Sequence, residues 1–350
     1  MASSGCCPLP DRLTDTVEMA HGGGGRMTAE LIAGVFAPAF SNDFLNRRHD
    51  AALLPEPDCR LAMTTDTFVV TPLFFPGGSI GDLAVNGTVN DLLCAGATPR
   101  YLSCGFVIEE GFPMESLRRV VADMAEAARL AEVEIVTGDT KVVERGRCDG
   151  VYINTSGIGY VPHGLDIDPG ALAPGDVIIC SGPVGCHGMA VMSVREGLEF
   201  SSPIKSDTAS LGDIVHNLLD VVAAPKVLRD PTRGGLSSTL NELAETSGVD
   251  IELDEEAIPV DPEVRSACEL LGLDPLYVAN EGLMLIAVSA DEAERALAAV
   301  RRSAHGSRAA IIGRVQPTAP GRAPAVWLRM PLGQRRRLEM LSGEQLPRIC

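Results

Sequence analysis

The chain has 350 residues, which is long enough for two domains of ordinary size. Its composition, with 45% hydrophobic and 22% charged residues, is that of an ordinary soluble globular protein. The 47 acidic residues outnumber the 29 Lys and Arg residues, and the resulting net charge of −18 excludes nucleic-acid binding, which needs clustered cations, as the main activity.

The cysteines and the apolar segments indicate the cellular compartment of the protein. The 10 cysteines include no pair with zinc-ligand spacing and are too few for a disulfide scaffold, so we expect mostly reduced core thiols. The N-terminus has no basic region followed by an apolar run, and the longest apolar stretch, Leu283–Val288, is far too short to span a membrane. We therefore predict a cytoplasmic protein with neither a membrane nor a nucleic-acid partner.

An extension and a glycine-rich loop take up residues 1–40. Four consecutive glycines, Gly22–Gly25, follow the first loose residues, and a helical pattern covers residues 28–36. Such a glycine run is typical of a flexible linker. The alternative is a mobile loop whose bare amides fold over phosphates.

Strands and helices alternate over residues 41–161, which we predict to form the first domain. Runs of β-branched residues predict strands at 60–70, 100–108, 133–137 and 151–160. Ser79 as a cap and an apolar period of three to four predict helices at 79–95 and 114–131. Pro113 takes a favoured first helical position.

Acidic residues lie inside these apolar elements or at their ends: Asp50, Asp66, Asp91 and Asp139. Carboxylates from several elements that converge on one cleft are what Mg²⁺ with a triphosphate requires. Each acid is also compatible with a surface turn or a helix cap. Leu83, Gly87 and Asp91 share one helix face, which predicts that another backbone or a ligand approaches closely there.

Lys141 follows Asp139 and could belong to the same site. A lysine there could stabilise charge on a transferring phosphoryl group or act as a base, with a solvated loop as the alternative. Glu281, in the second half of the chain, is likewise either a general base or a surface residue.

The second half repeats the alternation over residues 170–332, after a boundary rich in Gly and Pro at 162–174. We expect strands at 176–181, 283–288, 310–315 and 326–330. We expect helices from about residue 187, over 207–222, after Gly234–Gly235 and over 291–301. The paired glycines are compatible with phosphate approach and equally with a tight turn.

The last residues, 333–350, are predicted to be a flexible tail that ends in Cys350. A cysteine at a chain end is compatible with simple fraying. The alternative is a reactive thiol, which is exposed and held as a thiolate. Arg348 favours the thiolate, whereas the α-carboxylate of Cys350 opposes it.

Neither a P-loop nor a Rossmann glycine pattern is present, but longer stretches match a known family. They are His21–Arg26, Thr64–Gly78, Ile80–Asp91, Ile108–Pro113, Val136–Glu144, Asp230–Leu236 and Pro347–Cys350. On these stretches the chain resembles the HypE family of hydrogenase maturation factors, in the superfamily of aminoimidazole ribonucleotide synthetase, selenophosphate synthetase and thiamine-phosphate kinase. The Asp230–Leu236 stretch is shared within the superfamily, whereas Phe74–Asp91 and the terminal residues are more specific.

The resemblance implies an α/β fold of the aminoimidazole ribonucleotide synthetase-like type, with two domains that are each a mixed sheet covered by helices. It implies a homodimer formed through the first domain. It also implies ATP, bound by residues matching Gly22, Gly23, Gly24, Asn90 and Thr140. Mg²⁺ would be held by acids matching Asp50, Asp66, Asp91 and Asp139, with Lys141 and Glu281 as the matching candidate bases.

The reaction implied by the resemblance is carried on Cys350. A partner carbamoyltransferase, HypF, loads a carbamoyl group onto the thiol, ATP phosphorylates the carbamoyl oxygen, and loss of phosphate leaves a thiocyanate. The nitrile then passes to iron on a HypC–HypD scaffold and becomes the cyanide ligand of nickel–iron hydrogenases. Two alternatives stay open: a selenophosphate synthetase, because of Cys6–Cys7 and Asp230–Leu236, and a non-catalytic ATP-binding scaffold.

Overall fold

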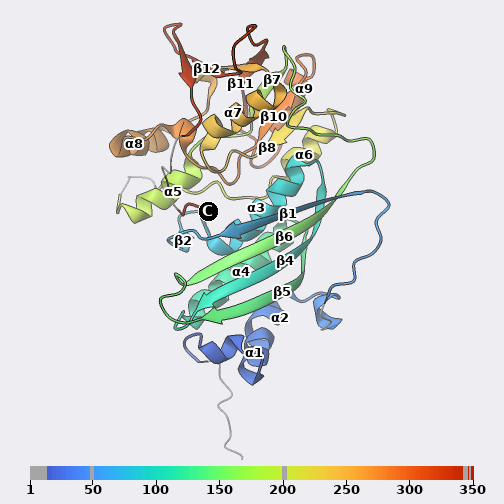
Figure 1. Ribbon diagram of the computed structural model, residues 1–350, viewed down its shortest axis with the longest axis vertical. Coiled ribbons are helices and arrows are strands. Elements are labelled where there is room, and N and C mark those ends of the chain that lie inside the picture. The colour runs from blue at the N-terminus through green and yellow to red at the C-terminus, as the bar shows by residue number, and fades with distance from the viewer. Residues whose placement is uncertain (1–13, 48–50, 199–202, 342–345, 347) are drawn as a thin grey trace, which may run out of the picture.

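The computed structural model describes residues 14–47, 51–198, 203–341, 346 and 348–350. The two halves of the chain form two domains stacked along the long axis of the molecule, and the C-terminus lies between them (Figure 1). Asp50 and the Cys6–Cys7 pair are outside the described residues.

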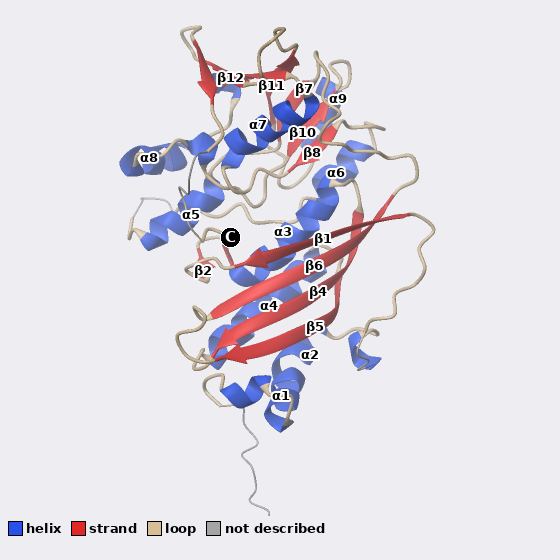
Figure 2. Ribbon diagram, viewed as in Figure 1, coloured by secondary structure: helices blue, strands red, loops and turns tan. Residues whose placement is uncertain are grey.

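The first domain is built on a four-stranded sheet with the order β1-β6-β4-β5. Its strands are β1 (Arg60–Phe68), β4 (Thr98–Glu109), β5 (Glu134–Val143) and β6 (Val151–Val161). β4 and β5 pair in parallel, whereas the other pairs are antiparallel, so the sheet is mixed. The helices α3 (Ile80–Cys94) and α4 (Met114–Leu130) cover one face of it (Figure 2).

Both helices follow from their sequence patterns. Ser79 caps α3 through a capping box with Asp82, as its position predicted. The apolar period of α4 buries Leu117, Val121 and Met124 against the sheet. Pro113 is the N-cap of α4 and not its first helical residue, so that detail of the prediction is wrong by one position.

The strand predicted at 133–137 is longer than its apolar run. β5 continues to Val143 because its parallel pairing with β4 continues through Glu109↔Val143. Asp139, Thr140 and Lys141 therefore lie within a strand and not in the loop that was expected to follow it.

Shorter elements surround the first sheet. Ahead of β1 come a 3₁₀ turn (Met19–Gly22), α1 (Arg26–Leu31), a π turn (Ile32–Phe36), α2 (Ala37–Phe40) and a second 3₁₀ turn (Leu45–Arg47). The two-residue strands β2 (Phe74–Phe75) and β3 (Gly78–Ser79) form a small hairpin before α3.

The second domain contains a seven-stranded sheet with the order β13-β12-β9-β11-β7-β10-β8. Its strands are β7 (Val177–Cys180), β8 (Val227–Arg229), β9 (Asp250–Asp254), β10 (Leu285–Val288), β11 (Ala310–Gln316), β12 (Val326–Arg329) and β13 (Arg335–Leu338). Its helices are α5 (Cys186–Arg195), α6 (Gly212–Leu219), α7 (Gly235–Ser247), α8 (Pro262–Leu271) and α9 (Ala293–Val300), with 3₁₀ turns at Glu255–Ala257 and Pro275–Tyr277. β9 and β12 pair in parallel, so this sheet is mixed as well. The predicted fold class of two mixed sheets covered by helices is confirmed.

Two predicted boundaries change. The helix expected over 207–222 begins only at Gly212, because the Asp207 carboxylate accepts the N–H groups of Glu281 and Gly282 and fixes its own segment there. β13 lies within the predicted tail and pairs with β12, so the sheet extends past residue 332. Among the described helices, none has the length and apolar character needed to cross a bilayer.

Gly87 explains why one face of α3 is held so close to β1. A Cβ atom at Gly87 would lie 2.9 Å from Cζ of Phe68, which is almost fully buried, and 3.7 Å from Oδ2 of Asp66. The close approach predicted for this face is therefore made by a side chain of the neighbouring strand.

We expect the Gly87→Ala substitution to destabilise the protein by about 1–3 kcal/mol, because crowding a packed core outweighs the gain in helix propensity. Urea denaturation measures the change. Gly212→Ala is the matched control, because the nearest atom its new Cβ meets is Ser210 Oγ at 3.6 Å, and we expect no loss of stability there. A Gly87→Ala protein as stable as the parent would contradict this account.

Candidate active site

A group of carboxyl side chains lies where the first domain meets the second. Asp66 on β1 and Asp91 on α3 are close enough that the Asp91 charge contributes, after burial, to raising the pKa of Asp66. Thr64 Oγ1 donates to Asp91 Oδ2 at 2.8 Å. Burial and the Asp91 charge also raise the pKa of Asp230, which follows β8, to about 6. The structure thus brings two of the predicted metal ligands together and adds Asp230 to them.

Glu281 belongs to the same group and is 5% exposed. Burial, followed by the charges of Asp230, Asp207, Asp66 and Asp91, raises its pKa well above the ordinary value. Its main-chain N–H donates to the Asp207 carboxylate at 3.3 Å, and the N–H of Gly282 does so at 3.1 Å. Glu281 is therefore a buried carboxyl group that holds its proton strongly, and its ionised form is a strong proton acceptor.

The end of the chain docks beside this group of carboxyl side chains. The N–H of Val69 donates to a terminal oxygen of Cys350 at 3.1 Å, and the N–H of Thr71 donates to the Arg348 carbonyl at 3.3 Å. The tail thus runs antiparallel beside the segment that follows β1, and Ile349 is only 3% exposed. Cys350 lines a cavity of about 330 Å³ together with Arg233 and Tyr277.

The surroundings of Cys350 oppose the thiolate that was one of the two alternatives for this residue. Burial, followed by the Glu281 charge, raises its pKa to about 12, and only the Arg233 cation opposes this among the larger causes. Arg348 does not face the thiol, because its guanidinium pairs with Asp149 and donates from Nε to the Val69 carbonyl. The seated thiol is therefore protonated and close to Glu281.

A second group of predicted site residues lies along β5. Lys141 Nζ and Asp139 Oδ2 form an exposed ion pair of 2.8 Å, and the hydrogen bond from Lys141 is the main cause that lowers the pKa of Asp139. Gly22 packs against this strand so closely that a Cβ atom would lie 2.6 Å from Val142 N. Gly22 and Thr140 thus lie at this second group, whereas a Cβ atom on Gly23 would meet only the Ala20 carbonyl oxygen, at 3.7 Å, and one on Gly24 nothing within 4 Å.

Within one chain the two groups stay apart. β1 and β5 are the opposite edges of the sheet, with β6 and β4 between them, so their backbones are about 14 Å apart at the usual strand spacing. Asp139 pairs with Gly105 and so faces away from α3, whereas Asp66 pairs with the buried Thr155 and faces that helix. The structure therefore does not bring Asp139 and Lys141 to Asp66, Asp91 and Glu281.

Asn90 connects the two domains. Its side-chain amide donates to the carbonyls of Ala209 and Glu281 at 2.9 and 3.2 Å, and its Oδ1 accepts from the N–H of Leu211 at 2.9 Å. Both of its N–H groups are thus used within the protein. Asn90 holds the backbone of Glu281 in place, so a direct contact to a nucleotide is not needed to explain it.

The carboxyl side chains at the domain boundary could hold the implied Mg²⁺ only together with phosphate oxygens and water. No three or more His, Cys, Asp or Glu side chains in the described ranges are placed to hold a metal ion by themselves. Mg²⁺ in phosphate-binding sites is commonly held by one or two carboxylates together with phosphate oxygens and water. The Asp66 and Asp91 pair fits that arrangement.

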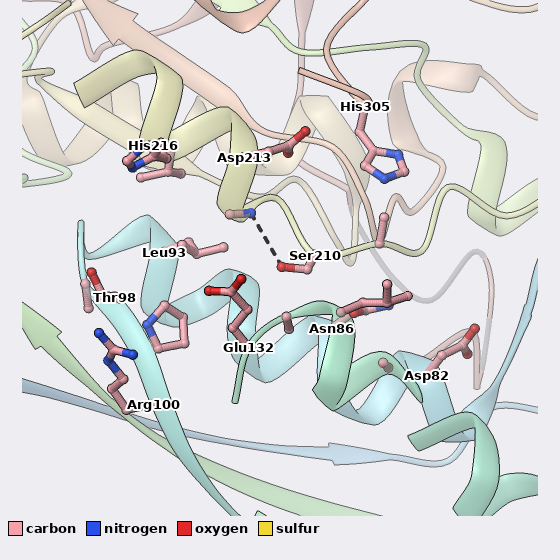
Figure 3. A pocket seen from close by; sticks show the side chains of 18 of the residues that line it. Asp82, Asn86, Leu93, Thr98, Arg100, Glu132, Ser210, Asp213, His216 and His305 are labelled. Carbon is pink, nitrogen blue, oxygen red and sulfur yellow. Dashed lines mark hydrogen bonds between the residues drawn. The ribbon is translucent and has the colours of Figure 1, made fainter. Parts of the chain in front are cut away.

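A larger cavity of about 840 Å³ lies between α3, α4 and α6 (Figure 3). Asp82, Glu132, Asp213, His216 and His305 are among its lining residues. None of the predicted catalytic or metal-binding residues that the structure describes lines it, so it is separate from the cleft that holds Cys350.

Sequence reasoning missed Asp207 and His187 and gave Asp230 no separate role. Asp230 and Arg233 belong to a stretch that was used only as a family match. Asp207 fell inside a predicted helix, and His187 had no local signal beyond its place near a helix start.

The comparisons with known proteins agree with this architecture. Residues 48–161 match the family model of the AIR synthase related protein, N-terminal domain, and residues 173–323 match that of the corresponding C-terminal domain. The two matches and the two mixed sheets define a two-domain protein of the AIR synthase-related class.

Similarity over nearly the whole chain narrows the class to one family. The carbamoyl dehydratase HypE of Cupriavidus necator is 53% identical and covers 95% of each chain. A crystal structure of the hydrogenase maturation protein HypE in complex with ATP has a TM-score of 0.91 at 49% identity, covering 95% of this chain and 99% of its own. In a HypE–HypF complex, the matching chain has a TM-score of 0.78 at 47% identity, with 89% and 99% covered. The chain belongs to the HypE family of carbamoyl dehydratases.

Proposed function

We propose that the protein uses ATP to dehydrate an S-carbamoyl group on its own Cys350 to a thiocyanate, which supplies the cyanide ligand for nickel–iron hydrogenase maturation. The observation that carries this proposal is the position of the C-terminal thiol, which lies close enough to the buried carboxyl group of Glu281 for that charge to raise the pKa of the thiol. The ATP complex of a relative with 49% identity supports ATP as the nucleotide.

The chemistry needs a phosphoryl acceptor and a base. The carbamoyl oxygen is a poor leaving group, and transfer of the γ-phosphoryl group of ATP converts it into phosphate. Both protons leave the carbamoyl nitrogen, the C–O bond breaks, and the C≡N bond forms with sulfur still attached. Glu281, once ionised, accepts one of these protons beside this group, and the released phosphate accepts the other. Mg²⁺, when bound, would offset phosphate charge, and Asp66 and Asp91 are the residues suited to hold it.

A homodimer would unite the two groups of site residues. The sheet face opposite α3 and α4 exposes Leu61, Met63 and Val107, with 57%, 74% and 37% of their surface accessible, which favours contact with a second copy. Lys141 lies on this same face. In a dimer formed there, Lys141 and the Gly22–Gly24 loop of one copy would complete the ATP site at Asp66 and Asp91 of the other.

The partners follow from the reaction. A carbamoyltransferase of the HypF type loads Cys350, and the HypE–HypF complex of relatives supports that contact. An iron-carrying HypC–HypD scaffold receives the nitrile. All of these steps suit a cytoplasmic protein.

The mass of the C-terminal peptide tests the proposal. After incubation with the carbamoyl donor system, the peptide should gain one carbamoyl group, and adding Mg-ATP should then remove one water. A carbamoylated peptide that releases no phosphate with Mg-ATP would favour a scaffold role instead. Selenide-dependent release of AMP would favour selenophosphate synthesis.

We expect Asp91→Asn to weaken Mg²⁺-dependent ATP binding by at least about tenfold, because the loss of one carboxylate from a metal site commonly costs that much. Calorimetric titration with and without Mg²⁺ measures the effect. Asp82→Asn is the control, because Asp82 also belongs to α3 but lines the separate cavity. Unchanged affinity in Asp91→Asn would remove this residue from the metal site. Asp139→Asn should weaken binding only if the dimer places it at the phosphates.

A further inference from the structure

His187, near the start of α5, contacts the docked tail directly. Its Nε2 lies 2.7 Å from the Ile349 carbonyl oxygen, and its Nδ1 lies 2.8 Å from Ser206 Oγ. The side chain is fully buried, with the ring of Phe75 edge-on at 5.4 Å. Both ring nitrogens are therefore committed to partners on opposite sides.

The direction of these hydrogen bonds is fixed by their partners. A carbonyl oxygen can only accept, so Nε2 carries the hydrogen that binds Ile349. Burial lowers the pKa of His187 to about 4, so the ring is neutral near pH 7 and Nδ1 accepts from the Ser206 hydroxyl. Ser206 Oγ in turn accepts the N–H of Thr208 at 3.1 Å. The result is one directed chain from the Ser206 hydroxyl to the tail.

Ser206 precedes the residue that fixes Glu281. The Asp207 carboxylate accepts the N–H groups of Glu281 and Gly282. The two segments are packed so tightly that a Cβ atom on Gly282 would lie 1.7 Å from the Asp207 carbonyl oxygen. A shift of the segment at Ser206 would therefore be passed on to the backbone of Glu281.

Other contacts hold the tail without touching that segment. Arg195 donates to the carbonyls of Thr71 and Arg348, and Arg348 pairs with the exposed Asp149. These contacts secure the tail at the β1 side. His187 differs from them because it joins the tail to the segment that positions Glu281.

We propose that His187 is a positioning residue that holds the tail in its seat through Ile349 and couples that seat, through Ser206, to the placement of Glu281. The inference rests on the proposed function, since it assigns a positioning contact to the same site. When the tail leaves, His187 Nε2–H loses its acceptor, so the seated state and the aligned Glu281 favour each other.

Replacing His187 with Gln or with Asn removes one of its two hydrogen bonds and keeps the other. Gln places its amide near the Nε2 position and keeps the tail bond, whereas Asn reaches only the Nδ1 position and keeps Ser206. In the full-length protein without nucleotide, alkylation of Cys350 is followed by mass spectrometry, with the half-buried Cys59 as the internal reference. We expect His187→Asn to speed Cys350 labelling about tenfold, the worth of one hydrogen bond, and His187→Gln to stay within about twofold of the parent. Equal labelling in parent and His187→Asn would overturn the proposal.

A truncated chain keeps the test decisive if His187→Asn is poorly stable. In a protein ending at Leu346, the tail bond is already absent, so His187→Asn should lower the Tm of the full chain and leave that of the truncated chain unchanged. An equal shift in both chains would assign His187 to packing alone and overturn its role at the tail.

Ser206→Ala tests the coupling to Glu281. This variant keeps the tail bond, so labelling of Cys350 should match that of the parent. ATP-dependent loss of water from the carbamoylated tail should slow about tenfold, because Glu281 is less well held. An unchanged rate would overturn the coupling. If the parent itself loses no water, the proposed function fails, whereas the labelling result still decides the role of His187 at the tail.

Discussion

Replacing Cys350 with alanine is expected to reduce ATP-dependent thiocyanate formation to background while ATP affinity stays within about twofold of the parent value, as for a substitution that touches no binding group. The physical reason is that, in the proposed function, the thiol sulfur carries the reacting group. Four of the other described cysteines, Cys104, Cys180, Cys186 and Cys268, are buried in the cores and cannot replace it.

Mass spectrometry of the C-terminal peptide and calorimetric titration with ATP measure the two effects. Cys148→Ala is the matched control, because this half-buried thiol lies in the loop between β5 and β6 and should leave both quantities unchanged. Thiocyanate formation that persists in Cys350→Ala would place the reacting group elsewhere in the protein.

Replacing Glu281 with glutamine is expected to slow dehydration about 10²–10⁴-fold, the usual contribution of a positioned base. Glutamine keeps the size of the side chain but cannot accept the proton. The raised pKa of Glu281 gives the pH dependence its sign: the base works only when ionised, so the parent rate should fall on acidification at a higher pH than for an ordinary glutamate. That acid limb should be absent in Glu281→Gln.

Single-turnover rates across pH measure both effects, and Glu269→Gln, on the exposed side of α8, is the control. A residual rate in Glu281→Gln with the same acid limb as the parent would show that another group is the base.

Lys141 allows a separate test of the dimer. If it acts across a dimer, the inactive variants Lys141→Met and Cys350→Ala should regain activity when mixed, because one mixed site then has both residues intact. Mixing without recovery would place the action of Lys141 within its own chain.

The parts of the site that could be predicted from sequence are those set by local periodicity. Asp66 stands out in a strand, and Asp91 shares a helix face with Gly87, so both positions follow from element geometry alone. The extent of β5 does not, because Gly138 resembles a strand end, whereas pairing with β4 continues past it. The faces and edges that separate Asp139 from Asp66 depend on strand order, which no local pattern encodes.

The second-domain members of the site depend on contacts between distant segments. Asp207 stands at the start of the stretch that was predicted to be a helix, but its carboxylate accepts the N–H groups of Glu281 and Gly282 and the segment lies outside α6. The high pKa of the Cys350 thiol could not be read from Arg348, its neighbour in sequence, because the fold turns that arginine towards Asp149.

The docking of Cys350 on its own chain has a kinetic consequence. Because β13 ends at Leu338 and so tethers the tail twelve residues before Cys350, the thiol meets the cleft at an effective concentration of about a millimolar or more, whatever the protein concentration. The chemical step should therefore be first order and show no Michaelis constant for the carbamoyl group. Under the proposed function each molecule would act once per loading, and the supply of cyanide would be set by how often other proteins load and unload the tail.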